Sequence, residues 1–114
     1  MAIMASLILV MTSWMSHSWT RKKTINLEEL AEARSCMIES DFEHDGEFNS
    51  TYITGWGENL YQGSSGRLEY ILKLWKESPK HNEILNEDYK EMVLIVRKTD
   101  DSIMPYKAVY LIQR

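Results

Sequence analysis

Helical spacing of apolar residues marks two segments of the chain as amphipathic helices. The first begins after Asn26, whose side chain can cap a helix while Glu29 reaches back to the cap, and it extends to about Ser40. The second follows a turn over residues 62–66 and ends before Pro79, because the residue before a proline is disfavoured in helical geometry. The positions that this spacing assigns to one face of each helix are Leu27, Leu30, Ala31, Arg34, Met37, Ile38, Leu68, Ile71, Leu72 and Trp75.

Continuous apolar runs near the C-terminus predict two strands. Residues 92–97 (MVLIVR) have the composition of a strand buried on both faces, and residues 108–113 (AVYLIQ) follow after a polar turn. Together they predict an antiparallel hairpin, with a shorter strand-like run at 56–61 and a short helical turn at 81–86. Helices that cover an antiparallel sheet predict an α+β layered domain.

Residues 41–57 are rich in Asp, Asn, Ser, Thr and Gly, which predicts a surface loop. Within it Asn49-Ser50-Thr51 matches the acceptor pattern for N-glycosylation. Asn49 is therefore a candidate glycosylation site if the protein is secreted by a eukaryotic cell.

The first 20 residues contain no Asp, Glu, Lys or Arg, and residues 2–11 (AIMASLILVM) are nearly all apolar. This run is short for a membrane span, which needs about 20 apolar residues, and suits the core of a signal peptide. No basic residue precedes it, however, and no small-x-small cleavage site is evident. Two expectations stand equally for residues 1–18. They form a signal peptide or anchor, or they serve as the first helix of the domain, in place of another helix, with the rest of the domain at residues 19–114.

Composition excludes several classes of protein. The 114 residues suit one domain, and a net charge of −4 argues against a nucleic-acid-binding surface, which needs clustered Lys and Arg. Cys36 is the single cysteine, so neither an intrachain disulfide nor a cysteine-based zinc site can form. We expect Cys36 to be a small buried residue on a helix.

His44, Glu58 and His81 form the candidate constellation for chemistry. Two neutral imidazoles and a carboxylate are ligand types that zinc accepts, with a fourth position left for water. Alternatively, Glu58 is a general base beside an ion that the two histidines hold. The separations of 14 and 23 residues match no local ligand motif, so the residues alone do not establish a site.

Three phrases around these residues, in this order along the chain, resemble the CAP superfamily. This superfamily includes cysteine-rich secretory proteins, venom allergens, plant pathogenesis-related proteins and their microbial SCP-like relatives, and the single cysteine agrees with the disulfide-free microbial branch. The resemblance covers the chain from about Trp19 to its C-terminus. The phrases are Phe42-Glu43-His44-Asp45, Gly57-Glu58-Asn59-Leu60, and Trp75-x-x-Ser78-Pro79-x-His81-x-x-Ile84-Leu85-Asn86.

The resemblance implies a three-layer α-β-α sandwich with a small antiparallel sheet and an open cleft. Matched to this sequence, His44 and His81 are the ligands of zinc or another divalent cation, and Glu58, Asn59 and Ser78 line the cleft. Ser78 stands where many family members have a second glutamate, which favours binding over catalysis.

The function that follows from the resemblance is a secreted or surface-associated domain that binds a metal and a small-molecule, lipid or protein ligand. Trp56, Tyr61, Tyr70 and Trp75 suit lipid binding, although the helical spacing of Trp75 favours core packing. The alternative is a metal-dependent hydrolase in which Glu58 activates water. We expect neither a nucleic-acid partner nor a firm membrane span.

Overall fold

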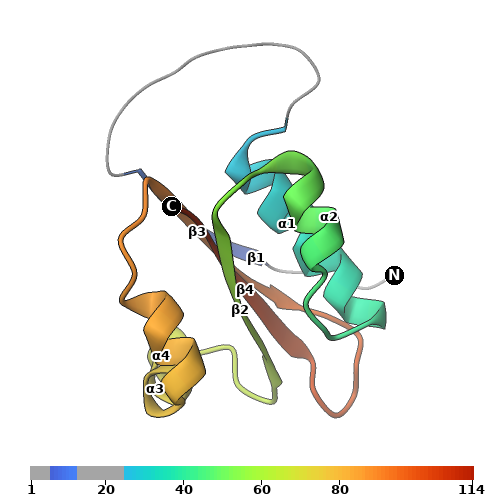
Figure 1. Cartoon of the computed structure of the whole chain (residues 1–114). Coiled ribbons are helices and arrows are strands. Elements are labelled where there is room, and N and C mark those ends of the chain that lie inside the picture. The colour runs from blue at the N-terminus through green and yellow to red at the C-terminus, as the bar shows by residue number, and fades with distance from the viewer. Residues whose placement is uncertain (1–5, 13–24) are drawn as a thin grey trace.

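The long apolar runs form the middle of one antiparallel sheet (Figure 1). The computed structural model of the chain describes residues 6–12 and 25–114. In these residues four strands pair in the order β1-β3-β4-β2, so that β3 and β4 are central and β2 lies at one edge. The elements are β1 (Ser6–Thr12), α1 (Leu27–Ser40), α2 (Gly46–Tyr52), β2 (Trp56–Gly63), α3 (Leu68–Glu77), α4 (Pro79–Leu85), β3 (Glu91–Lys98) and β4 (Tyr106–Gln113).

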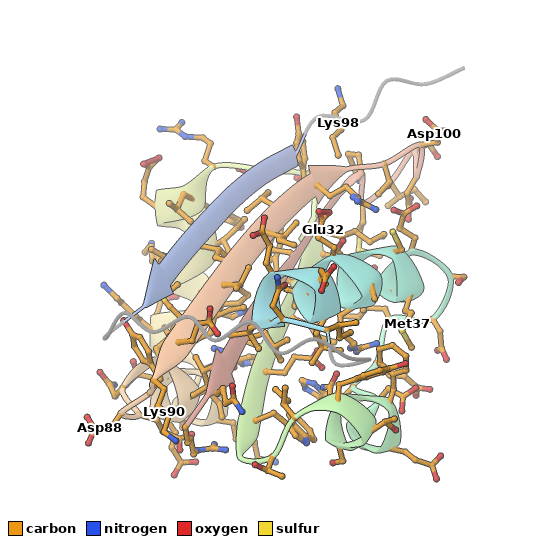
Figure 2. All side chains as sticks on the ribbon, turned by 90° about the horizontal axis from the view of Figure 1, so that it is seen from above. Glu32, Met37, Asp88, Lys90, Lys98 and Asp100 are labelled. Carbon is orange, nitrogen blue, oxygen red and sulfur yellow. The ribbon has the colours of Figure 1, made fainter. Side chains whose placement is uncertain are left out.

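Helices cover both faces of the sheet, as Figures 1 and 2 show from two directions. Side chains alternate between the faces of a strand, so β3 sends Val93 and Ile95 towards α1 and sends Leu94 and Val96 towards α3. The helices α1 and α2 lie side by side on one face, and α3 and α4 cover the other. The expected α+β class, with helical layers on both faces of a small antiparallel sheet, is confirmed.

The two long helices begin and end where the sequence predicts. Asn26 Oδ1 accepts from the Glu29 backbone N–H at 2.8 Å, while Glu29 Oε1 accepts from the Asn26 N–H at 2.9 Å, which completes a capping box on α1. Helix α3 ends at Ser78, which has extended backbone angles, and Pro79 begins α4. The sharp junction between α3 and α4 therefore lies at Ser78.

The segment predicted as a surface loop contains a helix, α2. Asp45 caps it by accepting from the Phe48 N–H at 2.9 Å. This helix has too few apolar residues for their spacing to predict it. Nevertheless, Phe48 packs against the core and Asn49 is completely buried. The expectation of a loop throughout residues 41–57 is therefore wrong.

The apolar N-terminal segment contains a strand and not the substitute helix. Ser6–Thr12 pair antiparallel with β3, from Ser6 opposite Arg97 to Thr12 opposite Glu91. The apolar run thus serves as an edge strand, because the hydrogen-bonding edge of β3 is available to it. The remaining residues of the 1–18 segment lie outside the described residues, and the signal peptide stays a prediction. Among the described residues, no helix has the length and apolar character to cross a membrane.

Cys36 is exposed on α1, which corrects the expectation of a buried residue. It lies next to the buried Ser35, on the side of the helix that the core does not cover. The guanidinium of Arg97 on β3 donates from Nη1 to Cys36 Sγ at 2.8 Å and to Glu39 Oε2 at 3.2 Å. This contact ties the C-terminal half of α1 to the sheet.

Candidate functional site

Glu58 on β2 forms a buried ion pair with Arg34 on α1. Glu58 lies opposite Leu111 in the sheet and faces the α1 layer, where its side chain has no exposed surface and that of Arg34 is 1% exposed. Arg34 Nε donates to Oε2 at 2.8 Å, and Nη2 donates to Oε1 at 3.1 Å. The guanidinium therefore donates to both oxygens of the carboxylate, in the bidentate geometry that arginine favours.

Arg34 also holds the loop that carries His44. Its Nη2 donates a second hydrogen bond, of 2.8 Å, to the backbone carbonyl of Glu43. Its Nη1 lies 3.8 Å from Met37 Sδ. One buried side chain thus connects helix α1, strand β2 and the segment between α1 and α2.

His44 completes the cluster from that segment. Its Nδ1 lies 2.9 Å from Glu58 Oε1, and its side chain is 53% exposed. An ionised carboxylate can only accept hydrogen bonds, so Nδ1 carries the proton in the neutral imidazole and Nε2 keeps its lone pair. Within the part of the chain that the structure describes, Nε2 of His44 has no hydrogen-bond partner.

The surroundings of Glu58 keep it ionised. Burial raises the pKa of this carboxyl, but hydrogen bonds from His44 and Arg34, together with the charge of Arg34, outweigh burial and leave the pKa below its ordinary value. An anion with a low pKa is a poor acceptor of protons near neutral pH. The position suits Glu58 to orient His44 more than to activate water.

Asn49 borders the same carboxylate from α2. Its Nδ2 lies 3.5 Å from Glu58 Oε2, at the limit of hydrogen bonding, and its Oδ1 has no partner in the described residues. The side chain is 0% exposed, so a glycan cannot be accommodated on it in the folded domain. The burial of Asn49 in the folded chain thus argues against a glycan there, and the glycosylation site stays a prediction.

The second histidine lies in the other helical layer. His81 on α4 has its Nδ1 2.8 Å from Ser78 Oγ. Asn59 on β2 donates from Nδ2 to the backbone carbonyl of His81 at 2.9 Å. Because Glu58 and Asn59 are consecutive on a strand, their side chains point to opposite faces, and β2 holds one histidine on each side.

The residues predicted to line one cleft therefore divide into two groups. Glu58 lies with His44 in the α1 layer, whereas Asn59 and Ser78 lie with His81 in the α4 layer. Burial lowers the pKa of His81, and repulsion from His44, when that imidazole is protonated, lowers it further. The two imidazoles thus lie within electrostatic reach of each other, at an edge strand of the sheet.

The cation ligands predicted from the sequence stay a prediction. Among the residues that the structure describes, no three His, Cys, Asp or Glu side chains are grouped as ligands of one metal ion.

Two of the aromatic residues considered for lipid binding belong to the core. Trp75 is 3% exposed and donates from Nε1 to the Leu60 carbonyl at 3.0 Å, and Tyr61 donates its hydroxyl to the Ser65 carbonyl at 2.8 Å. The core-packing interpretation of Trp75 is confirmed. Tyr70 is 45% exposed and borders a shallow hollow of about 420 Å³ over α3. That hollow is lined by Ser65, Arg67, Glu69, Tyr70 and Lys73.

Sequence reasoning assigned Arg34 to the apolar face of α1 and missed its part in the site. The available signal was an arginine one turn after Leu30 on a face that is otherwise apolar, because a buried guanidinium needs a buried acid. The partner could not be identified, since Glu58 lies 24 residues away on another element.

The fold and the site define a small α-β-α domain with an arginine–glutamate–histidine cluster beside an edge strand. Comparisons of the chain with protein-family models, with curated proteins and with solved structures found no match.

Proposed function

We propose that this chain is an SCP-like domain of the CAP type, secreted or surface-associated, that binds a divalent cation through Nε2 of His44 and Nε2 of His81. Zinc is the first candidate because it accepts neutral imidazole nitrogens. The observation that carries the proposal is the contact of 2.9 Å between His44 Nδ1 and Glu58 Oε1. This contact leaves the lone pair of Nε2 available to a cation, while the Glu58 carboxylate holds the Nδ1 side of the ring.

The arrangement of His44 is the one that metal-binding histidines commonly use. A ligating imidazole usually donates its other N–H to a carboxylate, a carbonyl or water, which fixes the tautomer and orientation of the ring. On the other side of β2, the Ser78 hydroxyl can accept a hydrogen bond from the Nδ1–H of His81, which leaves the lone pair of Nε2 available. Two protein ligands leave coordination positions open for a small-molecule, lipid or protein ligand with an oxygen donor.

Binding is favoured over catalysis by the state of Glu58. A hydrolase would use this carboxylate to take a proton from water, yet both of its oxygens already accept hydrogen bonds from Arg34. Its lowered pKa further weakens it as a base. Ser78, in contact with His81, adds no second carboxylate to the site.

Isothermal titration calorimetry of tag-free protein with zinc chloride tests the proposal. We expect one ion per chain for the wild type. Removing a residue that only hydrogen-bonds to a metal ligand typically lowers metal affinity ~10-fold to 100-fold, so we expect at least this loss of zinc affinity for His44→Ala and for His81→Ala. His17→Ala removes the remaining histidine of the chain and serves as the matched control, with unchanged binding expected. Equal zinc affinity in the wild type and the His44→Ala/His81→Ala variant would refute the proposal.

A further inference from the structure

We propose that Arg34 is the positioning residue of this site, which locks His44 in the Nδ1–H tautomer and so determines that Nε2 faces outward as the ligand atom. This inference deepens the proposed function of the same site and rests on it for the role of Nε2. The lock itself does not depend on a bound ion, and it can be measured on metal-free protein.

The oxygen of Glu58 that holds His44 is itself held by Arg34. Oε1 accepts from His44 Nδ1 at 2.9 Å and from Arg34 Nη2 at 3.1 Å, while Oε2 accepts from Arg34 Nε at 2.8 Å. With both oxygens engaged by the guanidinium, rotation of the carboxylate away from the imidazole would break two hydrogen bonds in a buried setting. The acceptor that faces Nδ1 is therefore fixed in place.

The backbone next to His44 is fixed by the same nitrogen atom. Arg34 Nη2 donates to the Glu43 carbonyl at 2.8 Å, one residue before the histidine. A short turn, in which the Glu43 N–H donates to the Asp41 carbonyl at 2.9 Å, precedes this carbonyl, and Asp45 starts α2 directly after His44. Arg34 thus sets both the acceptor for the imidazole and the backbone from which the imidazole extends.

His81 offers an internal contrast, because its Nδ1 faces a hydroxyl and not a carboxylate. A hydroxyl can donate or accept, so Ser78 permits either tautomer of His81. A lysine at position 34 would keep the positive charge but lacks the planar fork that reaches both carboxylate oxygens and the carbonyl. The lock on His44 therefore depends on the guanidinium of Arg34 and not on charge alone.

Long-range proton–nitrogen NMR on metal-free protein with labelled histidine reports the tautomer directly. At a pH where the imidazoles are neutral, we expect His44 of the wild type to be the Nδ1–H tautomer alone. In Arg34→Lys we expect a mixture of both tautomers and a loss of zinc affinity of about 10-fold to 100-fold. Arg34→Met is the second variant, and circular dichroism checks the fold of each.

Ile38→Ala is the matched control, because Ile38 is buried in the apolar core on the same helix, and its truncation weakens α1 packing without removing a hydrogen-bonding group of the site. We expect this variant to keep the wild-type tautomer and zinc affinity. An Nε2–H tautomer in the wild type would overturn the proposal, as would a wild-type tautomer in Arg34→Lys. If the tautomer responds to Arg34 as expected but no chain binds zinc, the lock stands and the proposed function fails.

Discussion

The buried pair of Arg34 and Glu58 makes each partner necessary to the other. Neither side chain is more than 1% exposed, so removing one partner leaves a charge without a counterion in the interior. A buried pair contributes little net stability compared with apolar residues of the same volume, but breaking one is costly. The pair is thus better understood as a device that orders the site than as a source of stability.

Replacing Glu58 with Gln tests this view of the pair. We expect Glu58→Gln and Arg34→Met each to lower the free energy of unfolding by about 3–5 kcal/mol, because each leaves one buried charge uncompensated. The double variant should lose less than the sum of the two, since no unpaired charge remains. Urea unfolding of the wild type, the two single variants and the double variant measures this double-mutant cycle. Strictly additive losses of the free energy of unfolding would contradict a direct interaction.

The residues on the two faces of β2 should affect stability in different pH ranges. His81 has a lowered pKa, so the unfolded chain binds its proton more readily, and stability falls as the pH drops below about 6.5 towards the pKa of the folded state. Glu58 also has a lowered pKa, so its contribution is present above about 4.3 and is lost as the pH falls through its folded pKa. We expect His81→Gln to remove the first loss alone, as measured by melting temperature against pH. An unchanged profile above pH 5 in that variant would contradict the account.

At this scale the sequence proposes His44, Glu58 and His81 as candidates but does not reveal the contacts that hold them in place. The contacts of Arg34 and Asn49 with Glu58 link three elements and cannot be read from spacing. Asn49 was assigned to an exposed loop because its neighbours are polar, whereas the structure turns it inward towards the carboxylate. Tertiary contacts with one buried acid explain both errors.

Strand β2 is the element that relates the two histidines. Its alternating side chains place Glu58 in the layer of α1 and Asn59 in the layer of α4. As an edge strand it leaves one side of this arrangement uncovered by further strands of the described sheet. A local feature of a strand thus brings together segments that are far apart in the sequence.

The cap of α2 is the local interaction that starts the helix beside His44. Asp45→Ala should remove the acceptor for the Phe48 N–H and cost about 1 kcal/mol of stability. Asp45→Asn keeps a capping oxygen and should remain within a few tenths of a kcal/mol of the wild type. Chemical denaturation measures both variants, and equal losses in the two would show that charge, and not capping, is what Asp45 contributes.

The apolar pattern predicted α1 and α3 from helical spacing, and it predicted β3 and β4 from continuous apolar runs that suit strands buried on both faces. It missed α2, whose seven residues include few apolar ones and whose start depends on the Asp45 cap. It also failed for residues 6–12, where an apolar run fits a helix or a strand and pairing with β3 decides between them. The errors occur where a neighbouring element, and not local preference, sets the structure.

For the whole molecule, the proposed site would join the two helical layers of the sandwich. His44 follows α1 and His81 lies on α4, on opposite faces of the sheet. An ion held by both imidazoles would connect these layers across the edge of β2. Ligand binding to the folded chain would then stabilise the whole domain by mass action.

This linkage predicts a metal-dependent stability. At a free zinc concentration of about 100 times the dissociation constant, the free energy of unfolding should rise by about 2.7 kcal/mol. The His44→Ala/His81→Ala variant should show no such gain, whereas the His17→Ala control should gain as the wild type does. Denaturation with and without zinc measures this difference, and an equal gain in all three chains would place the ion elsewhere.

The most direct test of the central claim is the position of the ion itself. Crystals of the zinc-loaded protein, examined by anomalous diffraction at the zinc absorption edge, should show one ion bonded to Nε2 of His44 and Nε2 of His81 at about 2.0–2.1 Å. Anomalous density away from the two histidines, bonding through Nδ1 of His44, or no bound ion at saturating zinc would contradict it.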